Sequence, residues 1–355
     1  MIALELGFGA LLVGFLALLA GPLHPVTLEA TGVTGLFALL LHLLPRGRGL
    51  GTERLHYVVR YGFLLWAFLG TARFVPALSR PLADATLLSV DRAIFGETPA
   101  LRFDLARHPR LAELFSAAYL TYQPYLHGCF LWALLKPEER GERLARPVFT
   151  TLVLGYVGYL LVPAVGPFVA LPSFVASPLV GGPLARLNLD IVNKGGAVFD
   201  VFPSLHTAVT LVLLRHDWKH ARRRFYVLAP VAILLIPSTM LLRMHYAVDV
   251  MAGALLAAGV LALEGRGRAG PSLQGSADLQ REPPLLRPHA ERARRCHRAD
   301  VRGGKILEDP EPHGVLVLET VVSPLGRGVV VEAVPRAPLA AVVRPVVLEE
   351  EGLLA

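Results

Sequence analysis

Charged residues are scarce in this chain of 355 residues: Asp, Glu, Lys and Arg make up 18% of it, while hydrophobic residues make up 54%. This balance excludes an ordinary soluble globular protein, whose surface needs more polar side chains. Several apolar runs approach or exceed the roughly 18 residues that mark a membrane-spanning helix. The lipid bilayer is therefore the expected surrounding of most of the chain.

Cysteine is almost absent, with Cys129 in an apolar segment and Cys296 in a polar one. Two such residues exclude a disulfide framework and do not indicate a metal site. We expect neither a metal nor another cofactor.

The formal net charge of +7 raises the question of nucleic acid. Residues 264–355, however, hold 13 basic and 13 acidic side chains, so the excess lies in the apolar part. There it is confined to short loops between hydrophobic segments, a pattern typical of membrane proteins rather than of polyanion binding. A nucleic-acid partner is therefore not expected.

Hydrophobic patterning predicts about eight spans and an all-α polytopic membrane bundle. The predicted spans are 2–21, 27–44, 57–77, 113–135, 148–166, 203–217, 226–242 and 245–263. The sixth has an apolar run of only about ten residues, so it spans only if the preceding polar residues belong to the same helix. The first is interpreted as a retained helix rather than a cleaved signal peptide.

Composition divides the chain into three parts. Residues 1–56 hold two transmembrane helices, 57–263 form the main membrane domain, and 264–355 are expected to be a disordered or weakly structured tail. The Val-rich stretches 315–331 and 340–347 could pair as strands within that tail.

Basic residues follow every even-numbered span and predict the orientation. They are Arg46, Arg48 and Arg54; Lys136, Arg140, Arg143 and Arg146; Arg215, Lys219, Arg222, Arg223 and Arg224; and Arg266 and Arg268. Both termini should therefore be cytoplasmic in a multi-pass protein of the cell membrane. The segments 78–112 and 164–202 should face outward, the first as a surface-lying stretch.

Two polar motifs open the sixth and eighth spans at their outer ends: Phe202-Pro-Ser-Leu-His-Thr207 and Arg243-Met-His-Tyr-Ala-Val-Asp249. His245 and Asp249 are four residues apart, so on a helix the carboxylate would hold one ring nitrogen of the imidazole. The other nitrogen would then be a nucleophile able to attack phosphorus. His206 would serve as general acid for the leaving group.

Phosphate charge must also be balanced. Arg243 offers a guanidinium, and Ser204 and Thr207 offer hydroxyl groups. If Pro203 occupies the first helical turn, backbone N–H groups of residues 204–206 add an anion site. For Arg243 the alternative is a side chain that snorkels to the interface.

Other polar and aromatic residues are given simpler interpretations. Tyr119, Tyr122 and Tyr125 could line a substrate groove but are expected to pack in the core. Arg73, Arg143 and Arg146 are candidate phosphate ligands but are expected to anchor helix ends instead. His216 and His220 are expected to be solvated in the inner basic loop.

These motifs resemble the type 2 phosphatidic acid phosphatase superfamily over roughly residues 57–263. In that family a Pro-Ser-x-His motif supplies the acid histidine, and a later His-x-x-x-Asp supplies the nucleophile and its carboxylate. The resemblance therefore assigns His206, His245 and Asp249, and implies a six-helix membrane bundle, here preceded by two extra helices.

The chain departs from the phosphatase branch, which has arginine where Thr239 stands and lysine where Glu139 stands ahead of Arg146-Pro147. Instead Phe202-Pro-Ser-Leu-His206 and the turn Pro163-Ala-Val-Gly-Pro167 resemble the inositolphosphotransferase and inositol phosphorylceramide synthase-like branch. A membrane lipid phosphate is the expected substrate, with headgroup transfer favoured. Simple hydrolysis remains an alternative, as does a non-catalytic lipid carrier or flippase in which the polar cluster only binds a phosphate headgroup.

Overall fold

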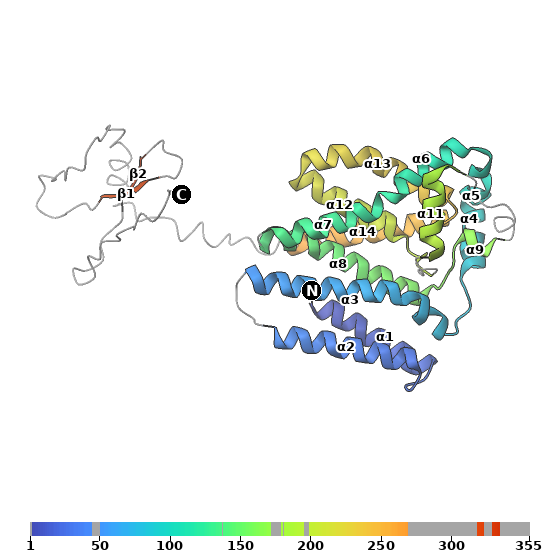
Figure 1. Cartoon of the computed structure of the whole chain (residues 1–355), viewed down its shortest axis with the longest axis horizontal. Coiled ribbons are helices and arrows are strands. Elements are labelled where there is room, and N and C mark those ends of the chain that lie inside the picture. The colour runs from blue at the N-terminus through green and yellow to red at the C-terminus, as the bar shows by residue number, and fades with distance from the viewer. Residues whose placement is uncertain are drawn as a thin grey trace, which may run out of the picture. The chain divides into compact units, whose positions relative to one another are not determined.

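A computed structural model describes residues 2–44, 50–136, 138–171, 179, 181–194, 199–268, 318–322 and 329–333. The long helices of its membrane part run side by side, and α4, α5, α9 and α11 gather at one end of them (Figure 1). The elements are α1 Ile2–Leu19, α2 Pro25–Leu43, α3 Leu50–Ala77, α4 Asp84–Phe95, α5 Pro99–Arg102, η1 Leu105–Arg107, α6 Pro109–Leu120, α7 Tyr122–Leu135, α8 Glu138–Leu161, α9 Pro167–Ala170, α11 Pro183–Lys194, α12 Leu205–His220, α13 Arg222–Leu241, α14 Ala247–Arg268, β1 Leu318–Val322 and β2 Val329–Ala333.

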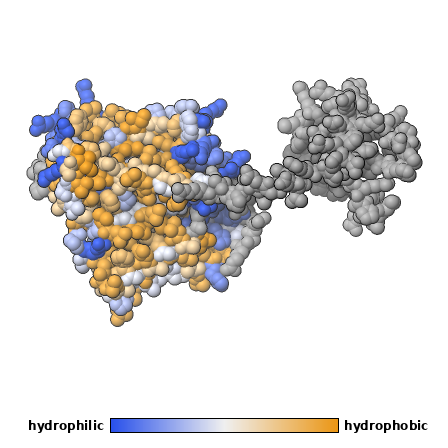
Figure 2. Space-filling model, turned by 180° about the vertical axis from the view of Figure 1, so that it is seen from behind, coloured by the Kyte–Doolittle hydropathy of each residue, from blue (hydrophilic) through white to orange (hydrophobic). Residues whose placement is uncertain are grey.

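Within the described residues, six helices are long and apolar enough to cross a membrane: α1, α2, α3, α8, α13 and α14. Figure 2 shows apolar residues over most of the visible face, with hydrophilic residues gathered mainly toward two opposite edges. The protein is therefore an all-α, multi-pass membrane bundle, as the sequence predicts.

Two predicted spans are not among these six helices. The span 113–135 is divided at Thr121 into α6 and α7. Pro124, at the start of α7, has no N–H to donate to the carbonyl of Leu120, which breaks the regular ladder. The sixth span, α12, is 16 residues long and packs against α7, α8, α13 and α14. Neighbouring helices rather than lipid therefore bury its short apolar run.

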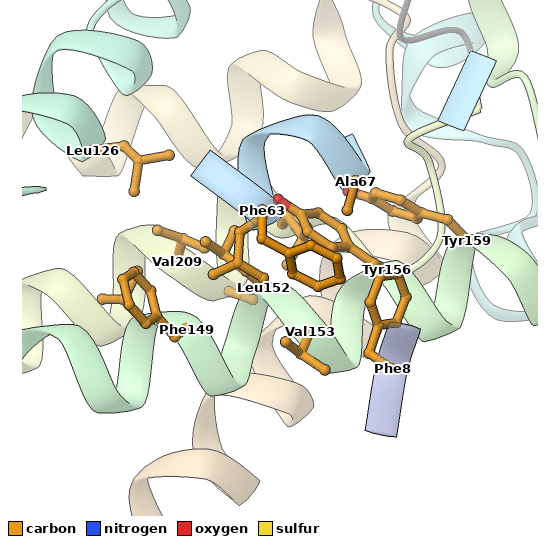
Figure 3. Packing of buried hydrophobic residues seen from close by; sticks show 14 of the residues in the cluster. Phe8, Phe63, Ala67, Leu126, Phe149, Leu152, Val153, Tyr156, Tyr159 and Val209 are labelled. Carbon is orange, nitrogen blue, oxygen red and sulfur yellow. The ribbon is translucent and has the colours of Figure 1, made fainter. Parts of the chain in front are cut away.

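The core is rich in aromatic rings contributed by helices far apart in the sequence. Phe63 of α3 stacks on Phe37 of α2, with ring centroids 4.1 Å apart, and contacts Phe8 of α1. Phe8 in turn contacts Tyr156 of α8, as Figure 3 shows. The two N-terminal helices therefore pack directly on α3 and α8.

A buried ion cluster joins the same helices. Arg60 of α3 is 4% exposed and donates hydrogen bonds to Glu5 of α1 at 2.7 Å and to Glu142 of α8 at 3.1 Å. Charges in apolar surroundings are tolerated when they are paired in this way. The cluster adds a polar link between α1, α3 and α8.

Beyond the membrane part, β1 and β2 pair antiparallel, with Leu318 opposite Ala333 and Val322 opposite Val329. The first Val-rich stretch therefore pairs within 318–333, and residues 340–347, its expected partner, lie outside the described residues. Helix α14 reaches Arg268, five residues past the predicted end of the last span.

Candidate active site

The two polar motifs meet at the end of the bundle where α4, α9 and α11 lie. His206 lies in the first turn of α12, and His245 lies two residues before α14. Nδ1 of His206 is 3.4 Å from Nε2 of His245, and the ring centroids are 5.6 Å apart at an interplanar angle of 69°. The two imidazoles are thus close enough to act on one ligand.

Asp249 lies beside the second imidazole, with Oδ2 3.6 Å from Nδ1 of His245. The expected helical stacking is wrong in one respect, because α14 begins only at Ala247 and His245 lies outside it. Asp249 is the third residue of the helix, and Oδ2 accepts the N–H of Tyr246 at 2.8 Å, as in a capping box. This bond draws the carboxylate back toward the residues that precede the helix.

Ser204 and Thr207 join α12 to α14. Ser204 is the N-cap of α12, because its hydroxyl accepts the N–H of Thr207, and its own N–H donates to the carbonyl of Asp249 at 3.0 Å. Pro203 therefore precedes the cap, so the condition set for the anion site, that Pro203 occupies the first helical turn, is not met. Serine is the better N-cap residue. Gly253 allows this approach, since a Cβ there would lie 2.3 Å from the carbonyl oxygen of Ser204.

Arg243 is buried at the site and does not snorkel, with 1% of its surface exposed. Its Nη2 donates to Oδ1 of Asp104 at 2.7 Å, a residue on the turn that leads into η1. Burial alone would raise the pKa of Asp104, but the hydrogen bonds from the N–H of Ala106 and from Arg243, together with the positive charges of Arg243 and Arg107, lower it. Asp104 therefore stays ionised opposite the guanidinium.

Two of the predicted core tyrosines contact the ring of His206. The ring centroids of Tyr119 and Tyr122 lie 4.8 and 4.3 Å from that of His206. Tyr125 is a core residue, as expected, and its hydroxyl donates to Asp217 at 2.9 Å. His206 is thus held in a mainly aromatic wall.

The remaining basic candidates lie away from the two imidazoles. Arg73 pairs with Glu29, and Arg146 pairs with Glu264. Arg143 lies fifteen residues before Gly158, the part of α8 that contacts Pro203, which corresponds to roughly 22 Å along the helix.

His216 was expected to be solvated, and this is wrong. It is 7% exposed and contacts Asp217, which also binds Tyr125 and Arg224. This polar cluster buries the ring against α7 and α13, whereas His220 is exposed as predicted.

Asp200 was missed by sequence reasoning, although it lies just before the first motif. Burial raises the pKa of its carboxyl to about 6, while its electrostatic interaction with His245 limits that rise. An acidic residue three positions before Pro203 was the available signal.

Asp200→Asn is expected to make the stability of the protein depend less on pH. Because burial raises the pKa of the Asp200 carboxyl from its ordinary value to about 6, the folded state loses stability as pH rises from about 4 through about 6. Asparagine carries no group that titrates, so the midpoint of thermal unfolding should fall more between pH 4.5 and 7 in wild type than in the variant. Thermal unfolding of both proteins in detergent measures the difference; an equal pH dependence of the two midpoints would contradict it.

Among the residues that the structure describes, no group of three or more His, Cys, Asp or Glu side chains could hold a metal ion.

A family model described as the PAP2 superfamily matches residues 85–263, just over half of the chain. The match begins in α4 and contains both histidine motifs, while α1, α2 and α3 precede it. Searches of curated proteins and of solved structures found no match. The matched segment holds every predicted site residue, and the chain belongs to the PAP2 superfamily.

Proposed function

We propose that this protein is a membrane phosphoesterase that acts on a lipid phosphate through a phosphohistidine on His245. Membership of the PAP2 superfamily supports a phosphatase-type enzyme with a lipid substrate. The observation that carries the mechanism is the row of Asp249, His245 and His206, joined by distances of 3.6 and 3.4 Å. A carboxylate, a nucleophile and a proton carrier in this order suit covalent catalysis.

In the first step, the lone pair of His245 Nε2 attacks phosphorus while the bond to the leaving lipid oxygen breaks. His206 gives its proton to that oxygen, so the leaving group departs as an alcohol. Asp249 keeps the proton on Nδ1 of His245 and stabilises the positive charge that develops on the ring. In-line transfer places phosphorus between the two imidazoles, so substrate binding has to widen their 3.4 Å contact.

In the second step, an acceptor oxygen attacks phosphorus and the P–N bond breaks. His206, now neutral, takes the proton of that oxygen, and both histidines return to their starting states. The acceptor is water in hydrolysis and a lipid hydroxyl in transfer.

Arg243 is the proposed ligand for the phosphate oxygens, because it is buried two residues before His245 and its guanidinium already binds a carboxylate, that of Asp104. Phosphate binding by Ser204 and Thr207 stays a prediction. The hydroxyl of Thr207 donates to that of Ser204 at 3.2 Å, and both residues shape the start of α12. The N–H groups of Leu205 and His206 at that helix start complete the proposed phosphate site.

Transfer of a headgroup to a second lipid is favoured over hydrolysis by the two motifs that resemble the inositolphosphotransferase branch. Incubation with phosphatidylinositol labelled in its headgroup separates the two reactions. Transfer moves the label to a new lipid, and hydrolysis releases it as water-soluble inositol phosphate.

The site is proposed to face the outside of the cell membrane, with both termini inside. The basic residues at or just past the C-terminal ends of α2, α7, α12 and α14 support this orientation, because such residues stay in the cytoplasm.

Trapping the covalent intermediate tests the mechanism directly. Wild-type protein is mixed with ³²P-labelled dioctanoyl phosphatidic acid and quenched in alkali, in which a phosphohistidine survives and from which acid removes it. Trypsin cleaves after Arg243 and Arg266, so the label should be found on the peptide of residues 244–266. Label on another peptide, or none during turnover, contradicts the proposal. The carrier alternative predicts lipid movement without any label on protein.

A further inference from the structure

Helix α4 carries two buried carboxylates that the proposed reaction does not use. Asp84 and Asp91 are 8% and 0% exposed, and their spacing of seven residues places them on one face of the helix. Burying an ionised carboxylate is unfavourable unless hydrogen-bond donors surround it. One of the three donors that the structure gives to Asp84, and two of the three it gives to Asp91, lie within three residues of His245. The other two donors to Asp84 come from the turn of residues 163–167.

Asp91 binds the start of α14. Its Oδ1 accepts the N–H of Val248 at 2.9 Å, and its Oδ2 accepts the N–H of Ala247 at 3.0 Å and the hydroxyl of Thr98 at 2.6 Å. The first N–H groups of a helix have no partner within it, and a negative charge there is favourable. Asp91 therefore fixes the backbone two and three residues after His245.

Asp84 binds the other side of the same loop. It accepts the hydroxyl of Tyr246 at 3.0 Å and the N–H groups of Val165 and Gly166 at 3.0 and 2.9 Å. Tyr246, the residue that follows His245, is completely buried. The carboxylate of Asp84 thus joins the loop of residues 243–246 to the turn of residues 163–167.

That turn is pressed against the backbone before His245. The N–H of Phe168 donates to the carbonyl of Arg243 at 2.7 Å. Gly166 has a φ of +76°, and a Cβ there would lie 2.4 Å from the carbonyl oxygen of Met244. The loop of residues 243–246 is therefore held on both sides. Asp91 fixes the start of α14 that follows it, and Asp84 joins it to the turn of residues 163–167.

We propose that Asp84 and Asp91 are positioning residues, which hold the imidazole of His245 in line with the phosphorus while touching neither substrate nor reacting atoms. This inference rests on the proposed function of His245. A displacement of about 1 Å of a reacting group costs on the order of 100-fold in rate. Loss of one carboxylate should therefore reduce catalysis far more than substrate binding.

Asp91→Asn tests this. The amide of asparagine keeps one oxygen acceptor, but its NH₂ group, a donor, would face one of the N–H groups at the start of α14, so one hydrogen bond is lost. With dioctanoyl phosphatidic acid, kcat should fall about 100-fold while KM changes by less than about threefold. Glu97→Gln is the matched control: it removes an exposed negative charge just past the end of the same helix and should behave as wild type. A kcat within threefold of wild type, or a loss confined to KM, would overturn the proposal.

Thr98→Val covers the case in which Asp91→Asn does not fold. It keeps the carboxylate and the side-chain shape and removes only the bond to Oδ2 of Asp91, so kcat should fall about tenfold. An unchanged kcat would overturn the proposal.

Amide hydrogen exchange separates this inference from the proposed function. Exchange at Ala247 and Val248 should be faster in Thr98→Val, and in Asp91→Asn where it folds, than in wild type and Glu97→Gln. If turnover did not depend on His245, the proposed function would fail, and hydrogen exchange alone would test the positioning role. Unchanged exchange would then reject the positioning role, and faster exchange would support it.

Discussion

Replacing His245 with alanine is expected to reduce phosphate release from dioctanoyl phosphatidic acid by at least about 10⁴-fold, because loss of a covalent nucleophile has an effect of this size. The imidazole is 2% exposed and lies between Asp249 and His206, so no neighbouring side chain can take its place. Release of ³²P-phosphate by purified wild-type and variant protein in detergent measures the loss.

His220→Ala is the matched control, since it removes an exposed imidazole from the last turn of α12 and should keep wild-type activity. The same two variants decide between enzyme and carrier when fluorescent lipid is followed in liposomes. Equal phosphate release by wild type and His245→Ala would reject the proposed enzyme mechanism. Equal lipid movement with no phosphate release in either would favour a carrier.

The two histidines of the candidate site, His206 and His245, could be predicted from the sequence because each belongs to a short motif at the start of a helix. His206 and Asp249 occupy the first turns of α12 and α14, and His245 lies just before α14. Such local features depend on residues within four or five positions of one another. The contact between the two motifs followed from the orientation expected for the spans.

The partners of these residues could not be predicted, because they come from distant segments. Asp104 pairs with Arg243 across 139 positions, and Asp91 binds Ala247 across 156. Only the packing of α4 and of the segment around η1 on the bundle makes these contacts. Asp200 is different, since it lies next to a motif and was open to detection from the sequence.

The length of apolar runs predicted six of the eight spans well. The other two, 113–135 and 203–217, correspond to helices too short to count as spans by length. The criterion assumes that lipid surrounds each helix, whereas α12 is surrounded by protein on most sides. The same enclosure buries His216, whose place in a basic loop suggested exposure. Polar residues near a helix end therefore require knowledge of the neighbouring helices before they are assigned to solvent.

The second large effect concerns the proton carrier and depends on the leaving group. His206→Ala is expected to slow turnover of dioctanoyl phosphatidic acid by about 10³-fold, because an alkoxide leaves poorly without a proton. With p-nitrophenyl phosphate the leaving group is a weakly basic phenolate that needs no proton. Formation of the phosphohistidine should then slow by less than about tenfold, since general acid catalysis contributes little to that step.

The later attack of water still needs His206 as a base, so the phosphohistidine should accumulate in this variant. A rapid release of one equivalent of p-nitrophenol per enzyme, followed by slow turnover, is the expected stopped-flow result. Equal slowing of both substrates without this burst would show that His206 does not carry the proton. The burst would also identify His206 as the group that acts in both steps, because only such a residue can be dispensable for one leaving group and required for the return to free enzyme.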